Sequence, residues 1–250
     1  MPTGYSFFID TTICTGCRAC QTACKQWNEN PAGQTTQSGT YQNPPDLNYD
    51  TFKLVRFAEG KKENGDPRQF FFTDQCRHCV FPLCKHAADE HAPGSVEIDP
   101  ETRAVVFNPE VEVSPEAFEH IRAMCPFDIP RYNAEIASIS KCTMCNDRVH
   151  EGMQPACVQA CPTGSMAFGF REEILDQARD RRAELRKSDK RVDLVDPGSV
   201  RVVYLVDDHP DKYHEHASAE GLRGVTRRAG LRGAVRVLAS YLGITRTGVT

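Results

Sequence analysis

The stretch CTGCRACQTAC at residues 14–24 places four cysteines at spacings of two, two and three intervening residues. Eight more cysteines follow along the chain: Cys76, Cys79 and Cys84; Cys125, before Pro126; and Cys142, Cys145, Cys157 and Cys161, before Pro162. In such a run, three closely spaced thiolates bind three irons of one cubane cluster, and the fourth thiolate reaches a second cluster. The twelve cysteines therefore match the ligands of three [4Fe-4S] clusters with none left over, which indicates a chain that conducts electrons.

Zinc sites and disulfides are two other uses of cysteine that compete with this interpretation. The residues that could pass for paired zinc knuckles are Cys142, Cys145, Cys157 and Cys161. The run at residues 14–24 could not, because tetrahedral zinc prefers two separated pairs of ligands to three thiolates at three-residue steps. Disulfides dominate short secreted chains that lack a core, and this chain has 250 residues, of which 40% are hydrophobic. Iron–sulfur clusters are therefore the favoured interpretation.

The length and charge of the chain set broad limits on its class. Its 250 residues allow one large or two small domains. A formal net charge of −4 provides no electrostatic case for nucleic acid as a partner. The first thirty residues do not resemble a signal peptide, and no apolar stretch reaches the ~20 residues needed to span a bilayer. We expect a chain with no transmembrane segment, either soluble or held at a membrane by another protein.

Short strands are expected to frame the cysteine runs. They are predicted at Tyr5–Ile9, Thr51–Ala58, Gln69–Thr73, Val96–Ile98, Ala104–Phe107 and Val200–Val206. The charged tract Glu59–Pro67 should form the turn of the first hairpin. Asn28–Tyr49 is rich in Gln, Asn, Gly, Thr and Pro, which predicts an irregular surface loop. With so little to bury internally, this loop is a candidate for part of an interface with a partner protein.

Two helices have clear sequence signals. Ser114-Pro115 supplies a hydroxyl cap followed by proline at the first helical position. The helix that follows should place Phe118, Ile121 and Met124/Cys125 on its inner face. A second, amphipathic helix is predicted over Arg171–Lys187. From about His209 onward we expect a separate tail.

The exchange of fourth ligands between paired ferredoxin runs predicts three ligand sets. Cluster 1 is assigned to Cys14, Cys17, Cys20 and Cys161. Cluster 2 is assigned to Cys24, Cys142, Cys145 and Cys157. Cluster 3 is assigned to Cys76, Cys79, Cys84 and Cys125. Cys24 departs from the ferredoxin run because Lys25, and not proline, follows it.

No set of residues on the chain suggests catalysis, since every cysteine has a place in a ligand set. His78 and His86 lie in the middle cysteine loop. His209, His214 and His216, near the tail, could form a metal site, but exposed polar side chains are the favoured interpretation. The cations that adjoin ligands are Arg18, Lys25, Arg77, Lys85 and Lys141. They could raise reduction potentials by favouring the more negative, reduced cluster, or they could simply be solvated surface charges.

The order of the cysteine groups resembles the four-cluster iron–sulfur subunits that accompany molybdopterin oxidoreductases. Complete second and third runs would place the ligands of a further cluster at Ala88 and near Pro115, Phe118 and Ile121. All four of these ligands are absent together and are replaced by helix-forming or apolar residues. The three remaining clusters keep every ligand.

Stretches outside the cysteine spacing resemble the small subunit of soluble tungsten formate dehydrogenases from sulfate-reducing bacteria. They are CQTACKQW (20–27), QNPPDL (42–47), QCRHC (75–79), CPFDIPR (125–131), KCTMCNDR (141–148) and RVVY (201–204). This resemblance covers roughly residues 5–217. It implies a large catalytic partner subunit with a tungsten or molybdenum bis-pterin centre, and an external acceptor such as a cytochrome c. It also implies a periplasmic location by co-export with the partner, with the cytoplasm as the alternative.

Two other functions stay open at this level. The chain could serve another molybdopterin oxidoreductase, because the substrate is chosen on the partner, or it could be a free-standing polyferredoxin. In each case we expect an α+β fold of two ferredoxin-like cluster-binding modules with short hairpins and helices, plus a C-terminal helical tail. The expected segments are 1–27 with 130–170 for two clusters, 50–129 for one cluster, 171–217 as a closing helix and strand, and the tail 218–250.

The predicted tail is basic and amphipathic. It contains no acidic residue after Glu220, and its arginines are Arg223, Arg227, Arg228, Arg232, Arg236 and Arg246. Its apolar stripe is Leu231, Val235, Leu238 and Leu242. Either a self-packed or frayed terminal helix, or a helix that docks on an anionic membrane or an acidic redox partner, is compatible with this pattern.

Overall fold

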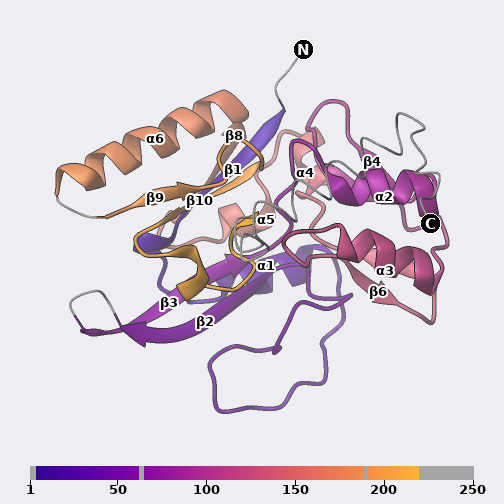
Figure 1. Cartoon of the computed structure of the whole chain (residues 1–250), viewed down its shortest axis with the longest axis horizontal. Coiled ribbons are helices and arrows are strands. Elements are labelled where there is room, and N and C mark those ends of the chain that lie inside the picture. The colour runs from indigo at the N-terminus through magenta and orange to yellow at the C-terminus, as the bar shows by residue number, and fades with distance from the viewer. Residues whose placement is uncertain (1–3, 62–64, 189–190, 220–250) are drawn as a thin grey trace, which may run out of the picture.

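A four-stranded sheet forms the centre of the computed structural model, which describes residues 4–61, 65–188 and 191–219 (Figure 1). Its order is β8-β1-β10-β9, with bounds β1 Tyr5–Asp10, β8 Met166–Phe170, β9 Asp193–Val195 and β10 Val202–Val206. β1 and β10 are parallel, with Phe8 opposite Val203, and the outer strands pair antiparallel. The strands predicted at Tyr5–Ile9 and Val200–Val206 are thus confirmed, although the second begins at Val202.

The alternation of side chains along these strands gives the sheet two buried faces. Phe7 and Ile9 enter one core cluster, whereas Phe8 enters another. Helix α6 (Arg171–Lys187) has the predicted bounds and lies along one face of the sheet, as Figure 1 shows. It packs in the same core cluster as Phe8. Its inner side buries Ile174, Ala178 and Leu185. The opposite face of the sheet packs in the core cluster that contains Cys20 and Cys157.

Three antiparallel hairpins complete the strands. They are β2 (Leu54–Lys61) with β3 (Pro67–Asp74), β4 (Val96–Ile98) with β5 (Val105–Phe107), and β6 (Arg131–Asn133) with β7 (Ser138–Ser140). The first two were predicted. The first is longer than expected, because the charged tract continues the ladder and Glu59 pairs with Gln69. The third was missed, since its strands are short and mostly polar.

Short helices connect the hairpins. They are α1 (Ala19–Trp27), α2 (Leu83–His91), α3 (Pro115–Ala123), α4 (Asn146–His150) and α5 (Ala156–Gln159), with 3-10 turns η1 (Thr11–Ile13) and η2 (Pro210–Lys212). The predicted cap of α3 is present, because Ser114 Oγ accepts a hydrogen bond from the Ala117 amide at 3.2 Å. One detail was wrong: α3 ends before Cys125, and Met124 is 39% exposed instead of facing inward. Together the helices and strands confirm the α+β class.

An apolar core occupies the place where a fourth cluster would need its ligands. Ala88, Phe118 and Ile121 are all buried in one hydrophobic cluster between α2 and α3, which lie side by side in Figure 1. Pro115 begins α3. The coherent loss of four ligands is therefore matched by a packed core at the same positions.

The segment between α1 and β2 is irregular, as predicted, and projects from the body of the molecule in Figure 1. Most of its side chains are exposed, but Leu47 is buried. Gln21 of α1 donates a side-chain hydrogen bond to the Asn43 carbonyl at 2.8 Å. The loop is thus fastened near its C-terminal end and open to solvent elsewhere.

The segment that follows β10 does not begin a separate tail at His209, so this prediction was wrong. Tyr213 and Ala217 are 2% and 1% exposed in the core that contains Phe7. The Tyr213 hydroxyl donates to the Asp207 carboxylate at 2.5 Å. The amphipathic tail predicted for 218–250 lies outside the described residues from 220 onward.

The core that contains Phe7 also contains Val55, Phe72 and Met144, which come from different expected modules. Side chains from these modules therefore share one core. The division of the chain into 1–27 with 130–170, 50–129 and 171–217 stays a prediction.

Candidate metal centres

Three of the four Cys-x2-Cys loops contain the same turn: Cys14–Cys17, Cys76–Cys79 and Cys142–Cys145. In each loop the residue before the second cysteine has a positive φ: 66° at Gly16, 43° at His78 and 65° at Met144. A Cβ on Gly16 would come within 2.7 Å of the Phe71 ring, so glycine is required there by contact as well as by φ. His78 and Met144 adopt this conformation without being glycine, which is unusual and typical of functional loops.

This turn directs backbone amides at sulfur. The His78 amide donates to Cys76 Sγ at 3.3 Å, and the Met144 amide donates to Cys142 Sγ at 3.4 Å. The Gly16 amide does the same for the Cys14 sulfur. Hydrogen bonds of this kind favour the thiolate over the thiol, and the thiolate is the form that binds metal.

The cysteines assigned to cluster 1 lie together. The hollow beside α1 is lined by Cys14, Cys17, Cys20 and Cys161. Cys14 interacts electrostatically with Cys161 and Cys17, and Cys20 interacts with Cys14 and Cys161. Residues more than 140 positions apart in sequence thus meet around one hollow.

The other two assigned sets are also electrostatic neighbours. Cys24 interacts with Cys142, Cys157 and Cys145. Cys79 interacts with Cys76, Cys125 and Cys84. Electrostatic interactions between the sets join them into a series: Cys157 with Cys20 and Cys161, and Cys142 with Cys76.

Burial controls the protonation of these thiols. It raises the pKa of Cys20, Cys84 and Cys142 to about 12 and that of Cys145 to about 11, with neighbouring thiolates adding to the rise. Without a metal they are therefore neutral at pH 7, and metal binding would release protons. The pKa of Cys161 is lowered, because hydrogen bonds from Thr163 and nearby amides outweigh its burial.

Buried donors without a partner support an iron–sulfur group at these positions. Among the described residues, Gln75 Nε2, Arg77 Nε and His78 Nε2 have no hydrogen-bond partner. The Val105 amide donates to His78 Nδ1 at 3.0 Å, which leaves the ring proton on Nε2. Burial lowers the pKa of His78 well below its ordinary value, so the ring is neutral. Cluster sulfurs accept N–H bonds, so these donors and the thiols around them fit such a group.

Within the described ranges, no three His, Cys, Asp or Glu side chains converge closely enough to hold a single metal ion. This finding does not conflict with the thiol groupings. A [4Fe-4S] cluster binds each thiolate through a different iron, so its ligands need not converge on one point.

The cations next to the ligands divide into two kinds. Arg77 is buried and forms an ion pair with Asp74 at 2.9 Å, and Lys141 is buried and donates to the Cys142 carbonyl at 3.0 Å. The other three are partly exposed: Arg18, Lys25 and Lys85. The description as solvated surface charges is therefore wrong for Arg77 and Lys141.

Lys53 is a buried cation that sequence reasoning missed. It is 1% exposed, and its Nζ donates to Gln75 Oε1. Because Phe52 and Leu54 are apolar, alternation along a strand predicts that Lys53 faces solvent. No cysteine is near it in sequence, so nothing local signals its position among the thiols.

The histidines near the C-terminal end differ in exposure. The His209 side chain is 71% exposed, as predicted, whereas that of His214 is only 13% exposed and lies 4.0 Å from Asp74. The prediction of an exposed His214 was wrong, because the segment after β10 packs against the β2–β3 hairpin side of the core.

Comparisons with known proteins agree with this chemistry. Residues 67–171 match the 4Fe-4S dicluster domain. The chain is 46% identical over 213 residues to formate dehydrogenase 2 subunit beta (cytochrome c-553) of Nitratidesulfovibrio vulgaris, covering 85% of this chain and 97% of that one. It is equally identical, over 85% of this chain and 98% of that one, to the formate dehydrogenase subunit beta of Megalodesulfovibrio gigas.

The chain belongs to the iron–sulfur (beta) subunits of formate dehydrogenases. A more distant member is the formate dehydrogenase-O iron-sulfur subunit of Escherichia coli, with 38% identity over 82% of this chain and 68% of that one. The family membership confirms an electron-transfer subunit with [4Fe-4S] clusters. A search of the described helices found none with the length and apolar character of a membrane span.

Proposed function

We propose that this beta subunit carries electrons through three [4Fe-4S] clusters held by all twelve cysteines. Cluster 1 would be held by Cys14, Cys17, Cys20 and Cys161. Cluster 2 would be held by Cys24, Cys142, Cys145 and Cys157. Cluster 3 would be held by Cys76, Cys79, Cys84 and Cys125. When bound, such clusters accept and release single electrons.

The observation that carries this proposal is the arrangement of the thiols in three neighbouring sets. The electrostatic interaction of Cys20 with Cys157 links the first two sets, and that of Cys142 with Cys76 links the second to the third. Cluster 2 would therefore lie between clusters 1 and 3 in the electron-transfer path. An electron entering at either end would cross the whole subunit.

The chemistry of formate would belong to the partner. The catalytic subunit would contain a tungsten or molybdenum bis-pterin centre, where formate is oxidised to carbon dioxide with release of two electrons and a proton. This chain would hold no catalytic residue and would pass the electrons to a cytochrome c or a membrane redox partner. A periplasmic location by co-export with the catalytic subunit suits such an acceptor.

The test is made on the copurified pair. It should reduce a viologen dye with formate, whereas this chain alone should show no activity. The chain rebuilt anaerobically should hold ~12 iron and ~12 acid-labile sulfide. Stoichiometric zinc, or saturation near ~16 iron, would contradict the three-cluster assignment. A stable pair that reduces no dye with formate, but oxidises reduced viologen in the presence of a sulfur or nitrogen oxide, would instead favour another molybdopterin enzyme.

The loop at residues 28–49 is the proposed contribution to the partner interface. Its exposed, irregular backbone has little to pack against in this chain. Amide hydrogen exchange should slow there when the catalytic subunit binds. Equal exchange with and without the partner would exclude the loop from the interface, and the absence of a stable pair would favour a free-standing polyferredoxin.

A further inference from the structure

Two hydrogen bonds fix the position of Lys53 beside helix α1. On one side of Lys53, the Asp50 carbonyl accepts from Lys25 Nζ at 3.0 Å, and on the other, the Val55 amide donates to Gln21 Oε1 at 3.0 Å. The segment that enters β2 is thereby held against α1. The buried residues of α1 are Cys20 and Cys24. Lys53 therefore lies next to the helix that supplies thiols to both cluster 1 and cluster 2.

The far side of Lys53 faces the end of β3. Its Nζ donates to Gln75 Oε1, and Gln75 directly precedes Cys76. The hollow of cluster 1 is lined in part by Val55 and Thr73, which flank this contact. The lysine head is thus enclosed between two cysteine-bearing segments and is 1% exposed.

No carboxylate balances this charge in the part of the chain that the structure describes. Lys53 forms no ion pair there, and its main electrostatic neighbours are the thiols of Cys157, Cys20 and Cys142 together with Tyr204. The thiols of Cys14 and Cys24 also interact with it. Burial disfavours its charge, but these neighbours outweigh burial and raise the pKa of Lys53 above its ordinary value. Arg77, the buried cation near Cys76, is by contrast paired with Asp74.

A buried ammonium group is strongly unfavourable unless an anion lies nearby. The thiols around Lys53 come from the ligand sets of two clusters: Cys20 from the first, and Cys157 and Cys142 from the second. Reduction adds one negative charge to such a group. A fixed positive charge beside it stabilises the reduced form more than the oxidised form, which raises the reduction potential.

We propose that Lys53 is a positioning residue that serves as a shared counter-ion between clusters 1 and 2 and raises the reduction potentials of both. This inference rests on the proposed three-cluster function. A charge shared by the two clusters shifts both of their potentials in the same direction. None of the cysteines assigned to cluster 3 is among the main electrostatic neighbours of Lys53, so the potential of cluster 3 should be unchanged.

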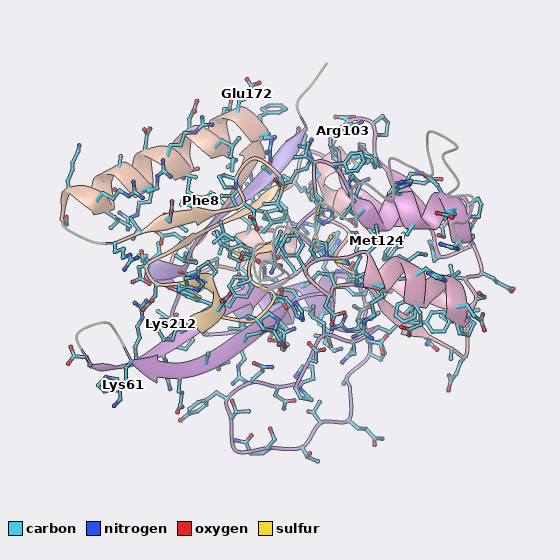
Figure 2. All side chains as sticks on the ribbon, viewed as in Figure 1. Phe8, Lys61, Arg103, Met124, Glu172 and Lys212 are labelled. Carbon is cyan, nitrogen blue, oxygen red and sulfur yellow. The ribbon has the colours of Figure 1, made fainter. Side chains whose placement is uncertain are left out.

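The test is an anaerobic redox titration of the wild-type subunit and of Lys53→Met and Lys53→Arg, followed by electron paramagnetic resonance. Lys53→Met should lower the midpoint potentials of two clusters and leave that of the third unchanged. Lys53→Arg should keep the wild-type potentials of those two clusters more closely than Lys53→Met. The matched control is Lys61→Met, where the side chain is exposed at the outer end of β2, the strand that follows Lys53 (Figure 2).

Iron content separates the possible failures. If the wild-type chain lacks ~12 iron, the proposed function itself fails. If it is fully loaded and Lys53→Met leaves all potentials unchanged, or shifts only the third cluster, the role of Lys53 is overturned. Lys53→Met could also fail to assemble the first two clusters. In that case, normal iron content in Lys53→Arg supports the counter-ion role, because the positive charge is then sufficient. Failure of both variants overturns the role, because the site then requires the shape of lysine and not its charge.

Discussion

Cys125 is the residue on which the pairing of ligands depends most directly, since it stands alone in the sequence. It follows α3, where the Ile129 and Phe127 amides donate to its sulfur and Cys76 is an electrostatic neighbour. Burial raises the pKa of this thiol to about 11 despite the two amides. The amides of the turn and a bound metal would therefore both be needed to convert this thiol to the thiolate that serves as a ligand.

We expect Cys125→Ala to remove one cluster selectively. Iron content should fall from ~12 to about 8 per chain, and the spectra of the other two clusters should remain. The neighbouring variant Met124→Ala, at a partly exposed position, is the control and should keep full iron content. Loss of signals from the paired clusters 1 and 2 would show that the ligand sets are wrong.

His214 predicts a pH dependence of stability. Burial lowers its pKa from 6.5 to about 4; Arg56, His216 and Arg77 act in the same direction, and Asp74 opposes them. The unfolded chain therefore binds a proton below pH 6.5 that the folded chain does not bind until about pH 4. Stability is complete above pH 6.5 and is lost as the pH falls, by about 1 kcal/mol between pH 7.5 and 5.5.

His214→Gln should remove this part of the pH dependence. The unfolding midpoint of the wild type should then fall more steeply than that of the variant as the pH is lowered through this window. His209→Gln, at a 71% exposed side chain, is the control and should follow the wild type. Parallel pH profiles for His214→Gln and wild type would contradict the prediction.

At the scale of elements, α3 shows how a local signal supports a distant site. Ser114 Oγ accepts from the Ala117 amide, and Pro115 occupies the first helical position. The helix then buries Phe118 and Ile121 against α2 and delivers the chain to Cys125. Phe118 and Ile121, which stand where ligands of a fourth cluster would be, therefore help to position the turn that contains Cys125.

Ser114→Ala should lower the free energy of unfolding by about 1 kcal/mol, because the first turn of α3 loses its cap. Denaturant unfolding of the loaded chain, followed by circular dichroism under anaerobic conditions, measures this change. Ser114→Asp preserves an acceptor at the cap and should be close to wild type. Equal losses for the two variants would mean that the hydroxyl packs and does not cap.

At the scale of the whole molecule, the last core residues set where a truncation can be made. Ala217 and Ser218 are buried, and the Ala219 amide donates to Asp196 at 2.8 Å. Ending the chain after Ala219 thus keeps every described contact of this segment and removes only the basic residues 220–250.

We expect this truncation to leave iron content and formate-dependent dye reduction unchanged. It should weaken binding to anionic vesicles, or turnover with the physiological acceptor at low salt, because six arginines are removed. Vesicle flotation and acceptor turnover at two ionic strengths measure the effect. If truncated and full-length chains behave alike in both assays, the tail has no docking role.

Patterns that act over a few residues were decided by the sequence itself. The cysteine spacing indicated the iron–sulfur chemistry, the Ser114-Pro115 cap marked the start of α3, and apolar periodicity gave the bounds of α6. The joint replacement at Ala88, Phe118 and Ile121 was visible for the same reason: ligand spacing is a local property that can be counted along the chain.

Features that depend on residues far apart in sequence were decided only by the tertiary structure. Lys53 reads as an exposed strand residue, but Gln75 and the thiols of Cys20 and Cys157 enclose it. The segment containing Tyr213 reads as a tail, but it completes the core around Phe7. Burial and electrostatic potential are sums over neighbours brought together by folding, so the local pattern around a residue does not contain them.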